Sequence, residues 1–379
     1  MKEGWEYKKL GEIATEMYRG SGIKRDQITK EGTPCVRYGE IYTTYNISFD
    51  SCVSYTNKEN ISSPKYFEHG DLLFAITGES VEDIGKTIAY LGNEKCLCGG
   101  DIICMKHQQN PKYLAYALST PDAIRQKGIG KTKLKVVHTN APALRSITIP
   151  IAPIDKQQSI VDYLDSAFAK IDAMKANAEK ALNEAKALFQ ASLKEMLEPK
   201  DGWEEKTLPD ISENLDSIRI PVTKKNRSEG KYPYYGASGI VDYVNDYLFD
   251  EDILLISEDG ANLLMRTYPI AFSVSGKVWV NNHAHVLSFK YMATQRFIEY
   301  FFAGFKLDDY ISGAAQPKLT QKALNSIPIS IPSEVSEQQS IVDTLDSLKS
   351  KVDRLQENYD KISQECNALK QAILRQVFE

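Results

Sequence analysis

A long segment with the periodicity of a helix occurs twice in this chain. Residues 157–197 align without a gap with residues 338–378, at an offset of 181, and 19 of the 41 aligned residues are identical. The units of solenoid proteins are only ~20–50 residues long. So wide a separation therefore indicates two similar halves, each with a globular block followed by one long helix.

The two globular blocks resemble each other at their ends and differ in between. Gly4-Trp5-Glu6 recurs as Gly202-Trp203-Glu204, and both blocks finish in alternating Ile and Pro, at 149–153 and 327–332. Proline favours extended backbone, so these closing segments are predicted to be strand-like. The middles, 20–120 and 219–300, show little similarity. The two halves are therefore expected to share a framework and to differ in what it carries.

Local patterns predict both strands and helices within each block. Residues 71–76 and 252–257 are continuous apolar runs that predict buried strands. Asn110-Pro111 is a helix-start signal, and the segment to about Lys127 is predicted as one helix, with 294–305 as its counterpart. The expected fold class is α+β, with two mixed α/β domains joined by two long antiparallel coiled-coil helices in a pseudo-two-fold arrangement. The predicted divisions are 1–153, 154–198, 199–333 and 334–379.

Apolar residues in both long segments recur every 3.5 residues on average, which is typical of a coiled coil. A register that pairs Ile160 with Ile373, Ala167 with Cys366 and Ile171 with Ile362 brings every seam residue onto another. Two unrelated amphipathic surface helices are the less favoured alternative. The predicted interface is Ile160, Leu164, Ile171, Met174, Leu188, Leu345, Leu348, Val352, Leu355, Tyr359, Ile362, Leu369 and Ile373.

Composition excludes several classes of protein. No apolar run has the ~18 residues that a membrane span needs, and no signal peptide is evident, so a cytoplasmic protein is expected. Six Cys in no metal-binding spacing indicate core thiols. Phosphate-loop, dinucleotide and Gly-x-Ser-x-Gly motifs are absent from the sequence, as is the Asn/Asp-Pro-Pro-Tyr/Phe segment of methyltransferases. No catalytic residue and no metal site are predicted.

Basic and amide residues cluster in places, although the net charge is −5. Lys131, Lys133 and Lys135 alternate in a stretch without acids, and Lys133 and Lys318 follow equivalent glycines. Such side chains position phosphates and read base edges, while a solvated loop surface is the alternative. The candidate DNA-binding residues are Arg19, Lys24, Arg37, Lys131, Lys133, Lys135, Lys224, Lys225, Arg227, Tyr234, Tyr235, Ser238, Asn262, Arg266, Lys277, Asn282, His283 and Lys318.

This ordered, duplicated set resembles the specificity subunit of Type I restriction-modification systems. The resemblance covers essentially the whole chain and rests on the Gly-Trp starts, the Ile-Pro ends and the pairs Gln157-Gln158 and Gln338-Gln339 that open each helix. Segments 232–240 and 256–261 are also similar to stretches of that family. The family's acid before the glutamines is kept as Glu337 but replaced by Lys156.

The resemblance implies two target recognition domains and a helical spacer. It implies that the subunit reads a two-part, asymmetric site on double-stranded DNA and binds two methylation subunits and, through the complex, restriction subunits. S-adenosylmethionine, ATP and Mg²⁺ would belong to those partners, and this chain would hold no cofactor and catalyse nothing. The complex would act as a DNA adenine methyltransferase and endonuclease in bacterial or archaeal defence. Alternatives are a self-contained nuclease or methyltransferase with an unrecognised site, and a coiled-coil adaptor that does not bind DNA.

Overall fold

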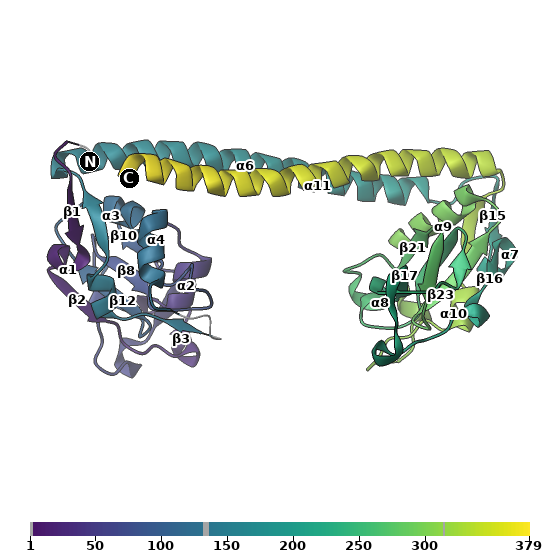
Figure 1. The fold of residues 1–379 in the computed structure, drawn as a ribbon, viewed down its shortest axis with the longest axis horizontal. Coiled ribbons are helices and arrows are strands. Elements are labelled where there is room, and N and C mark those ends of the chain that lie inside the picture. Colours follow the sequence, from purple (N-terminus) through teal and green to yellow (C-terminus); the bar gives the residue numbers. More distant parts are fainter. Residues whose placement is uncertain (1–2, 132–135, 314) are drawn as a thin grey trace. The chain divides into compact units, whose positions relative to one another are not determined.

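The structure is a computed structural model, and it describes residues 3–131, 136–313 and 315–379. The chain forms two compact units, Met1–Ala178 with Asp360–Glu379, and Glu179–Tyr359. Each unit holds one globular block and a part of both long helices, α6 (Ile154–Met196) and α11 (Val335–Phe378), as the colours of Figure 1 show. The expected mixed α+β architecture is confirmed in both units.

The repeated ends of each block pair with each other. In the first unit β1 (Glu6–Lys9) pairs antiparallel with β14 (Thr148–Ile151), and in the second β15 (Trp203–Lys206) pairs with β24 (Ile329–Pro332). The Ile-Pro segments are therefore extended, as predicted. Each forms a two-stranded sheet, in which proline is tolerated because both strands are edges. The ladder closes each block where its long helix begins.

The remaining strands of each unit form two larger sheets and, in the first, a small pair. The first unit has the strand orders β2-β12-β8-β10-β5 and β3-β6-β4-β11-β7, and also β13 (Val137–His138) with β9 (Thr77–Gly78). The bounds are β2 Glu16–Arg19, β12 Ile102–Lys106, β8 Leu72–Ala75, β10 Thr87–Tyr90, β5 Ser48–Phe49, β3 Ile28–Thr29, β6 Ser54–Thr56, β4 Thr33–Val36, β11 Cys96–Cys98 and β7 Tyr66–Phe67.

In the second unit the orders are β16-β23-β20-β21 and β18-β17-β22-β19. The bounds are β16 Ser212–Asn214, β23 Ala284–Phe289, β20 Ile253–Ser257, β21 Ala271–Val274, β18 Gly239–Val244, β17 Glu229–Gly236, β22 Lys277–Val280 and β19 Phe249–Asp250.

The two central strands, β8 and β20, are covered on both faces. Leu72 and Phe74 belong to a core shared with the helices, whereas Leu73 points into a second core between the sheets. Leu254 and Leu255 divide in the same way between two cores of the second unit. Successive side chains of a strand point to opposite faces, so a strand buried on both sides is apolar throughout. This explains the two continuous apolar runs and confirms both strand predictions.

The helix predicted from Asn110 to about Lys127 is two helices, and this prediction was wrong in its length. α3 (Pro111–Ala117) and α4 (Pro121–Gly128) are separated at Thr120, whose hydroxyl accepts a hydrogen bond from the Ala123 amide and caps the second helix. Pro121 cannot donate its backbone nitrogen to a continuing helix, so a new helix starts there. The counterpart, α9 (Met292–Gly304), is continuous, as predicted.

The first glutamine of each Gln-Gln pair attaches its helix to the block. Gln157 is fully buried, and its Oε1 accepts a hydrogen bond from the Asn110 amide at 2.9 Å. Gln338 is also buried; it donates to the Pro332 carbonyl at 2.8 Å and accepts from the Thr294 hydroxyl at 2.6 Å. The repeated motif therefore holds the helix start against the last strand and the block helix in both units.

A repeated aspartate makes a second attachment two turns further along. Asp165 accepts a hydrogen bond from the Tyr116 hydroxyl at 2.6 Å, and Asp346 accepts one from the Tyr300 hydroxyl at 2.5 Å. A basic side chain of the same block helix adds an ion pair in each unit. The residues shared by the two halves therefore fix block to helix.

The heptad assignment was partly wrong. Met174, Leu188 and Leu369 were predicted to lie in the seam, but their side chains are 60%, 58% and 48% exposed. On α6 the buried positions include Phe168 and Leu182 instead, each one residue beyond an expected alanine. Ala167 and Ala181 were expected in the seam because they align with the seam residues of the second helix at the offset of 181. Burial favours their larger neighbours instead. The other predicted interface residues are buried or half-buried.

Within each unit, the two long helices run in opposite directions, but their register differs from the prediction. In the first unit Cys366 Sγ lies 3.7 Å from the Ile171 carbonyl oxygen, whereas the expected partner of Cys366 was Ala167. The pairing is therefore shifted by about one helical turn, which brings Phe168 and the side chain of Lys370 together. The shift follows from the phase error, because moving the seam on one helix moves the holes that receive the other.

The two ends of the chain meet in the first unit. The ring of Trp5 lies 6.2 Å from that of Phe378, and Tyr113 contacts both (Figure 1 marks N and C). The end of α11 therefore completes the core beneath the first block.

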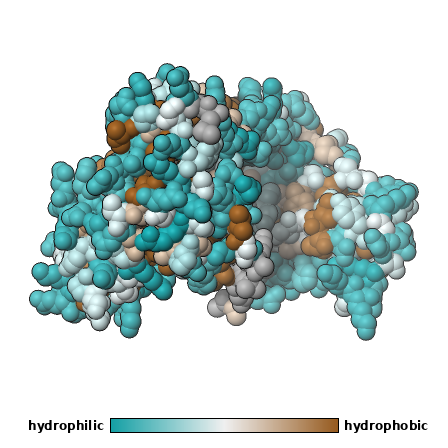
Figure 2. Space-filling view, turned by 60° about the vertical axis from the view of Figure 1, so that its left-hand side comes forward, coloured by the Kyte–Doolittle hydropathy of each residue, from teal (hydrophilic) through white to brown (hydrophobic). Residues whose placement is uncertain are grey.

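Hydrophilic side chains dominate the face drawn in Figure 2. All six cysteines are free and buried, as expected of core thiols. Within the part of the chain that the structure describes, no helix has the length and apolar character to cross a membrane.

Candidate nucleic-acid interface

Four loops converge at one end of the strands in the second block. They comprise residues 237–238, 258–260, 281–283 and 317–319, and are called the second loop edge below. The Glu258 amide donates to the His283 carbonyl at 2.9 Å, and the Gly260 amide donates to the Pro317 carbonyl at 3.0 Å. The β17–β18 turn joins them through a hydrogen bond from the Ser257 hydroxyl to the Ala237 carbonyl. Segments far apart in the sequence, including the family-like stretches 232–240 and 256–261, thus form one surface.

This edge presents four of the predicted DNA-binding residues. Ser238, Asn282, His283 and Lys318 are all exposed there. The His283 ring lies 2.9 Å from the Asp259 carboxylate, while the Lys318 ammonium lies 3.2 Å from Glu258. The edge therefore offers amide, hydroxyl, imidazole and ammonium groups side by side, the kinds of group that contact bases and phosphates.

A buried polar network lies directly behind Lys318. His285 of β23 is 1% exposed and contacts Asp216 at 2.6 Å through Nδ1. Arg219 lies between the two carboxylates, 3.3 Å from Asp216 and 2.7 Å from Glu258. Burial by itself raises the pKa of both acids, but the hydrogen bonds and charges of His285 and Arg219 hold the pKa of each below its usual value. Both carboxylates therefore stay ionised at neutral pH.

The same network is the one group of metal-ligand type found among the described residues. Asp216, Glu258 and His285 offer atoms within 4.8 Å of one another. The Arg219 guanidinium, however, already bonds to both carboxylates and supplies the positive charge that a cation would bring. We therefore assign no metal to this cluster.

The first block forms a corresponding edge from residues 19–21, 77–78, 99–101 and 137–139, called the first loop edge. The Ile76 amide donates to the Asp101 carbonyl at 3.0 Å, and the Thr139 amide to the Ile76 carbonyl at 2.9 Å. Of the predicted residues, Arg19 lies here in an ion pair with Asp101 at 2.7 Å. Arg37 lies beside it, against Gly99, and pairs with Glu40 at 3.1 Å.

The residue equivalent to Lys318 in the first block is His138. Each stands two residues before the N-cap of a short helix, Asn140 for α5 (Ala141–Arg145) and Thr320 for α10 (Gln321–Asn325). His138 lies 3.1 Å from the Thr77 hydroxyl, and its strand partner Thr77 corresponds to Asp259, which lies opposite Lys318 in an isolated bridge. The pairing of Lys133 with Lys318 from their preceding glycines is thus replaced.

Several predicted residues lie elsewhere or are used inside the fold. Lys24, Lys224 and Lys225 are exposed and Lys131 half-exposed, while Lys133 and Lys135 fall outside the described residues. Lys277 is exposed and lies over the ring of Tyr247. Tyr235 is half-buried against Phe272.

One assignment was wrong, and three others have structural partners. Tyr234 is 1% exposed, and its hydroxyl accepts a hydrogen bond from the Val222 amide, so it cannot reach DNA. Arg227 stacks on that ring and pairs with Asp242. Arg266 donates to the Phe302 and Phe305 carbonyls at the end of α9, and Asn262 closes a loop with Tyr268. Residue type alone does not show these internal partners.

Sequence reasoning did not identify the role of His285. It alternates with the predicted residue His283, but its carboxylate partners lie 69 and 27 positions away in the sequence. The i, i+3 spacing of Asp216 and Arg219 was the available local signal, because it places a carboxylate and a guanidinium on one side of a helical turn.

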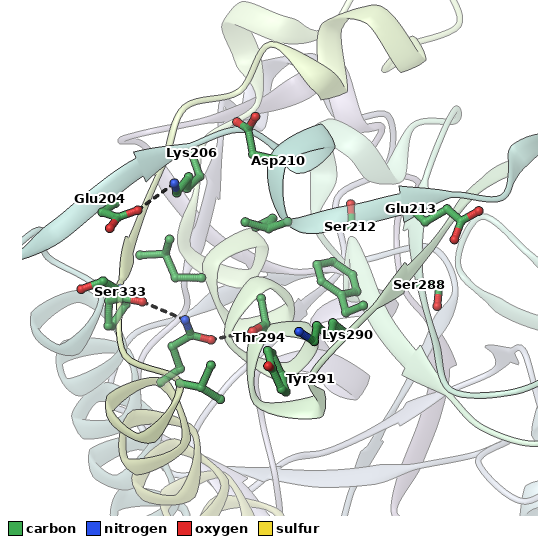
Figure 3. A pocket seen from close by; sticks show the side chains of 16 residues that line it. Glu204, Lys206, Asp210, Ser212, Glu213, Ser288, Lys290, Tyr291, Thr294 and Ser333 are labelled. Atoms are coloured by element: carbon green, nitrogen blue, oxygen red, sulfur yellow. Dashed lines mark hydrogen bonds and ion pairs between the residues drawn. The ribbon is translucent and has the colours of Figure 1, made fainter.

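A pocket of about 600 Å³ lies where α11 begins (Figure 3). Its polar groups are largely engaged: Glu204 pairs with Lys206 at 2.7 Å, and Gln338 bonds with Thr294. None of the residues that line it is His or Cys. The pocket is therefore part of the helix attachment, and nothing in its lining suggests nucleophilic chemistry.

Comparison with known proteins decides the family. The family model described as "Type I restriction modification DNA specificity domain" matches residues 2–184 and again 200–364. The chain belongs to this family. Each of the two matches spans one block and the larger part of the long helix that follows it, as the internal repeat predicted.

Individual relatives agree with this family. A putative Type I restriction enzyme specificity subunit from Haemophilus influenzae is 38% identical over 143 residues, which cover 38% of this chain and 36% of that protein. The match thus spans about a third of that relative's length. A chain from a structure of a Type I restriction-modification system has a TM-score of 0.77 at 16% identity, covering 100% of this chain and 98% of the other. The HsdS subunit from Thermoanaerobacter tengcongensis has a TM-score of 0.59 at 15% identity, covering 100% and 97%. These two solved chains share the fold of this protein.

Proposed function

We propose that this chain is the DNA specificity subunit of a Type I restriction-modification complex and that its two loop edges read different half-sites. The observation that carries the proposal is the exchange of chemistry within a shared framework. Where the second edge has Lys318 bonded to Glu258, the first has His138 bonded to Thr77. Two edges with different donors and acceptors favour different bases, so the target is two-part and asymmetric.

The side chains that we assign to DNA are exposed or half-exposed ones on and around each edge. In the second block these are Ser238, Asn282, His283 and Lys318, while Lys224, Lys225 and Lys277 add phosphate contacts around them. In the first block they are Arg19, Arg37, Lys131 and Lys24, and Lys133 and Lys135, which lie outside the described residues, are assigned from the sequence alone. Ion pairs such as Arg19 with Asp101 are exposed and therefore weak, so a phosphate can compete for the cation.

The chain is proposed to bring no catalytic group of its own. Its loop edges hold recognition groups, and the histidines and carboxylates described there are each bonded to a neighbouring side chain. We propose that two methylation subunits bind this chain and that restriction subunits join through them, in the cytoplasm where the DNA lies. S-adenosylmethionine, ATP and Mg²⁺ are then held by those partners, which carry out adenine methylation and cleavage.

Methylome sequencing of a host strain with and without this gene, together with its methylation partner, tests the proposal. We expect methylation at one two-part, non-palindromic site that disappears with the gene. The H138K variant gives the first edge the cation of the second and should change one half of that site only. A continuous or palindromic target, or a change in both halves, would contradict the proposal.

Purified chain alone, incubated with duplex DNA, Mg²⁺ and S-adenosylmethionine, provides the complementary test. We expect neither cleavage nor methyl transfer until the methylation subunits are added. Turnover by the isolated chain would show that it is an enzyme in its own right.

A further inference from the structure

Both ring nitrogens of the buried His285 face hydrogen-bond acceptors. Nδ1 lies 2.6 Å from an Asp216 carboxylate oxygen, and Nε2 lies 2.9 Å from the backbone carbonyl oxygen of Leu319. A carbonyl oxygen cannot donate, so the Nε2 bond requires a proton on that nitrogen. A neutral imidazole has only one N–H, which leaves nothing for Nδ1 to donate.

The remaining choice is between a charged His285 and a protonated Asp216. The other oxygen of Asp216 accepts the Val286 amide at 2.8 Å, and Arg219 approaches the carboxylate at 3.3 Å. These donors stabilise the ionised acid. The geometry therefore requires two N–H groups on His285, which is the imidazolium form.

A charged His285 makes the buried network electrically balanced. Asp216 and Glu258 contribute two negative charges, while Arg219 and His285 contribute two positive ones. Lys318 lies at the outer end, 3.2 Å from Glu258, with its side chain 49% exposed. Because the network is neutral without it, the charge of Lys318 remains available to a ligand outside.

We propose that His285 is a positioning residue for DNA recognition by the second loop edge, which holds Lys318 in place and keeps its positive charge free for a phosphate. The proposal rests on the proposed function. His285 fixes the Leu319 carbonyl, next to Lys318 in the chain, and its charge satisfies the acids behind it. Without the charge of His285, the network is left with a net negative charge, and Lys318 becomes its counterion. DNA binding then weakens.

The described charged groups that face His285 are those already named. Asp216 and Arg219 approach from the turn before β17, and Glu258 approaches from the end of β20 at 3.8 Å. The neighbouring pair of His283 and Asp259 is on the exposed side of the edge and bonds internally at 2.9 Å.

The protonation state can be measured directly in the full-length chain. Its five histidines can be labelled with ¹⁵N, and the His285 signals assigned by comparison with the H285Q variant. We expect both ring nitrogens of His285 to carry hydrogen at pH 7. One protonated and one bare nitrogen would overturn the proposal, whatever the DNA measurements show.

The functional consequence is measured in the complex with its methylation subunits, as affinity for the cognate duplex. H285Q and K318A should each bind about fivefold more weakly at pH 7 and 0.15 M salt, the contribution of one released counterion, and lower the salt slope by about 1. The double variant should be no weaker than either single variant.

Each outcome has a distinct meaning. K318A removes an exposed group and leaves the buried network intact, so it tests the coupling even if H285Q folds poorly. Wild-type affinity of K318A for the cognate duplex, or a double variant that binds about fivefold more weakly than K318A alone, overturns the proposal. Absence of specific duplex binding by the wild-type complex would instead refute the proposed function, and the nitrogen measurement would still decide the state of His285.

Discussion

Lys127 provides a test of how this fold accommodates a charge in its interior. It lies on α4, 5% exposed, and its ammonium donates to the Leu118 carbonyl at 2.8 Å and to the Thr87 hydroxyl at 3.1 Å. No carboxylate is among these partners, and burial lowers the pKa of Lys127 from 10.5 to about 7. Protonation therefore costs free energy in the folded state that it does not cost in the unfolded chain.

The sign and size of the effect follow from linkage. Between pH 7 and 10.5 the unfolded chain binds nearly one proton more at this position than the folded chain, so the free energy of unfolding increases with pH. From pH 7 to pH 9 the increase due to Lys127 is about 2 kcal/mol. Lys127→Met removes this term and leaves the Leu118 carbonyl without its donor, at a cost of about 1–3 kcal/mol at all pH values.

Urea unfolding of the full chain at pH 7, 8 and 9 measures this difference. Of the three tryptophans only Trp5 lies in the first unit, so a background of W203F and W279F makes the fluorescence report on the unit that contains Lys127. We expect the gap between Lys127→Met and its parent to shift by about 2 kcal/mol over this range, in favour of the parent at high pH. Lys30→Met, at an exposed position, is the matched control and should follow the parent. A constant gap would show that Lys127 remains charged in the fold and that the reasoning is wrong.

Two further predictions concern the attachment and pairing of the long helices. Leu182→Ala, at a position 3% exposed, should lower the free energy of unfolding of the second unit by about 2–5 kcal/mol, whereas Leu188→Ala, at 58% exposure, should change it by less than about 0.5 kcal/mol. Equal effects of the two substitutions would show that the original heptad assignment, with Leu188 in the seam, is right. Asp346→Asn weakens the bonds from Tyr300 and Arg296, and we expect a loss of about 1–2 kcal/mol in urea unfolding followed by the fluorescence of Trp203 and Trp279 in a W5F background, with none in Ser347→Ala beside it.

The framework of this protein was predictable because its residues are repeated in the two halves of the sequence. Gln157 and Gln338 make the same type of bond in both units, and a residue selected twice for one geometry is visible as a repeat. The extended Ile-Pro ends and the central strands were likewise fixed by backbone chemistry and burial. Phe168 and Leu182 show where this reasoning failed. Carrying the phase of one helix onto the other ignored that their seams hold residues of different size, and size decides which position is buried.

The loop edges could not be predicted in the same way, because there the two halves have diverged. Lys318 and His138 occupy one structural position, but the glycines before them stand at different distances along the chain, so pairing those glycines matched Lys318 with Lys133 instead. The equivalence follows from the segments after them, because Ala-Leu-x-Ser-Ile at 143–147 and 323–327 aligns at an offset of 180. Behind these positions the two blocks also differ: Glu258, with its buried counterions, stands where the first block has the apolar Ile76. A framework that fixes the cap and leaves the preceding residues free lets each block change its recognition groups without disturbing its attachment to the helices. That separation is what a protein requires if it is to read a new DNA sequence and still assemble in the same way.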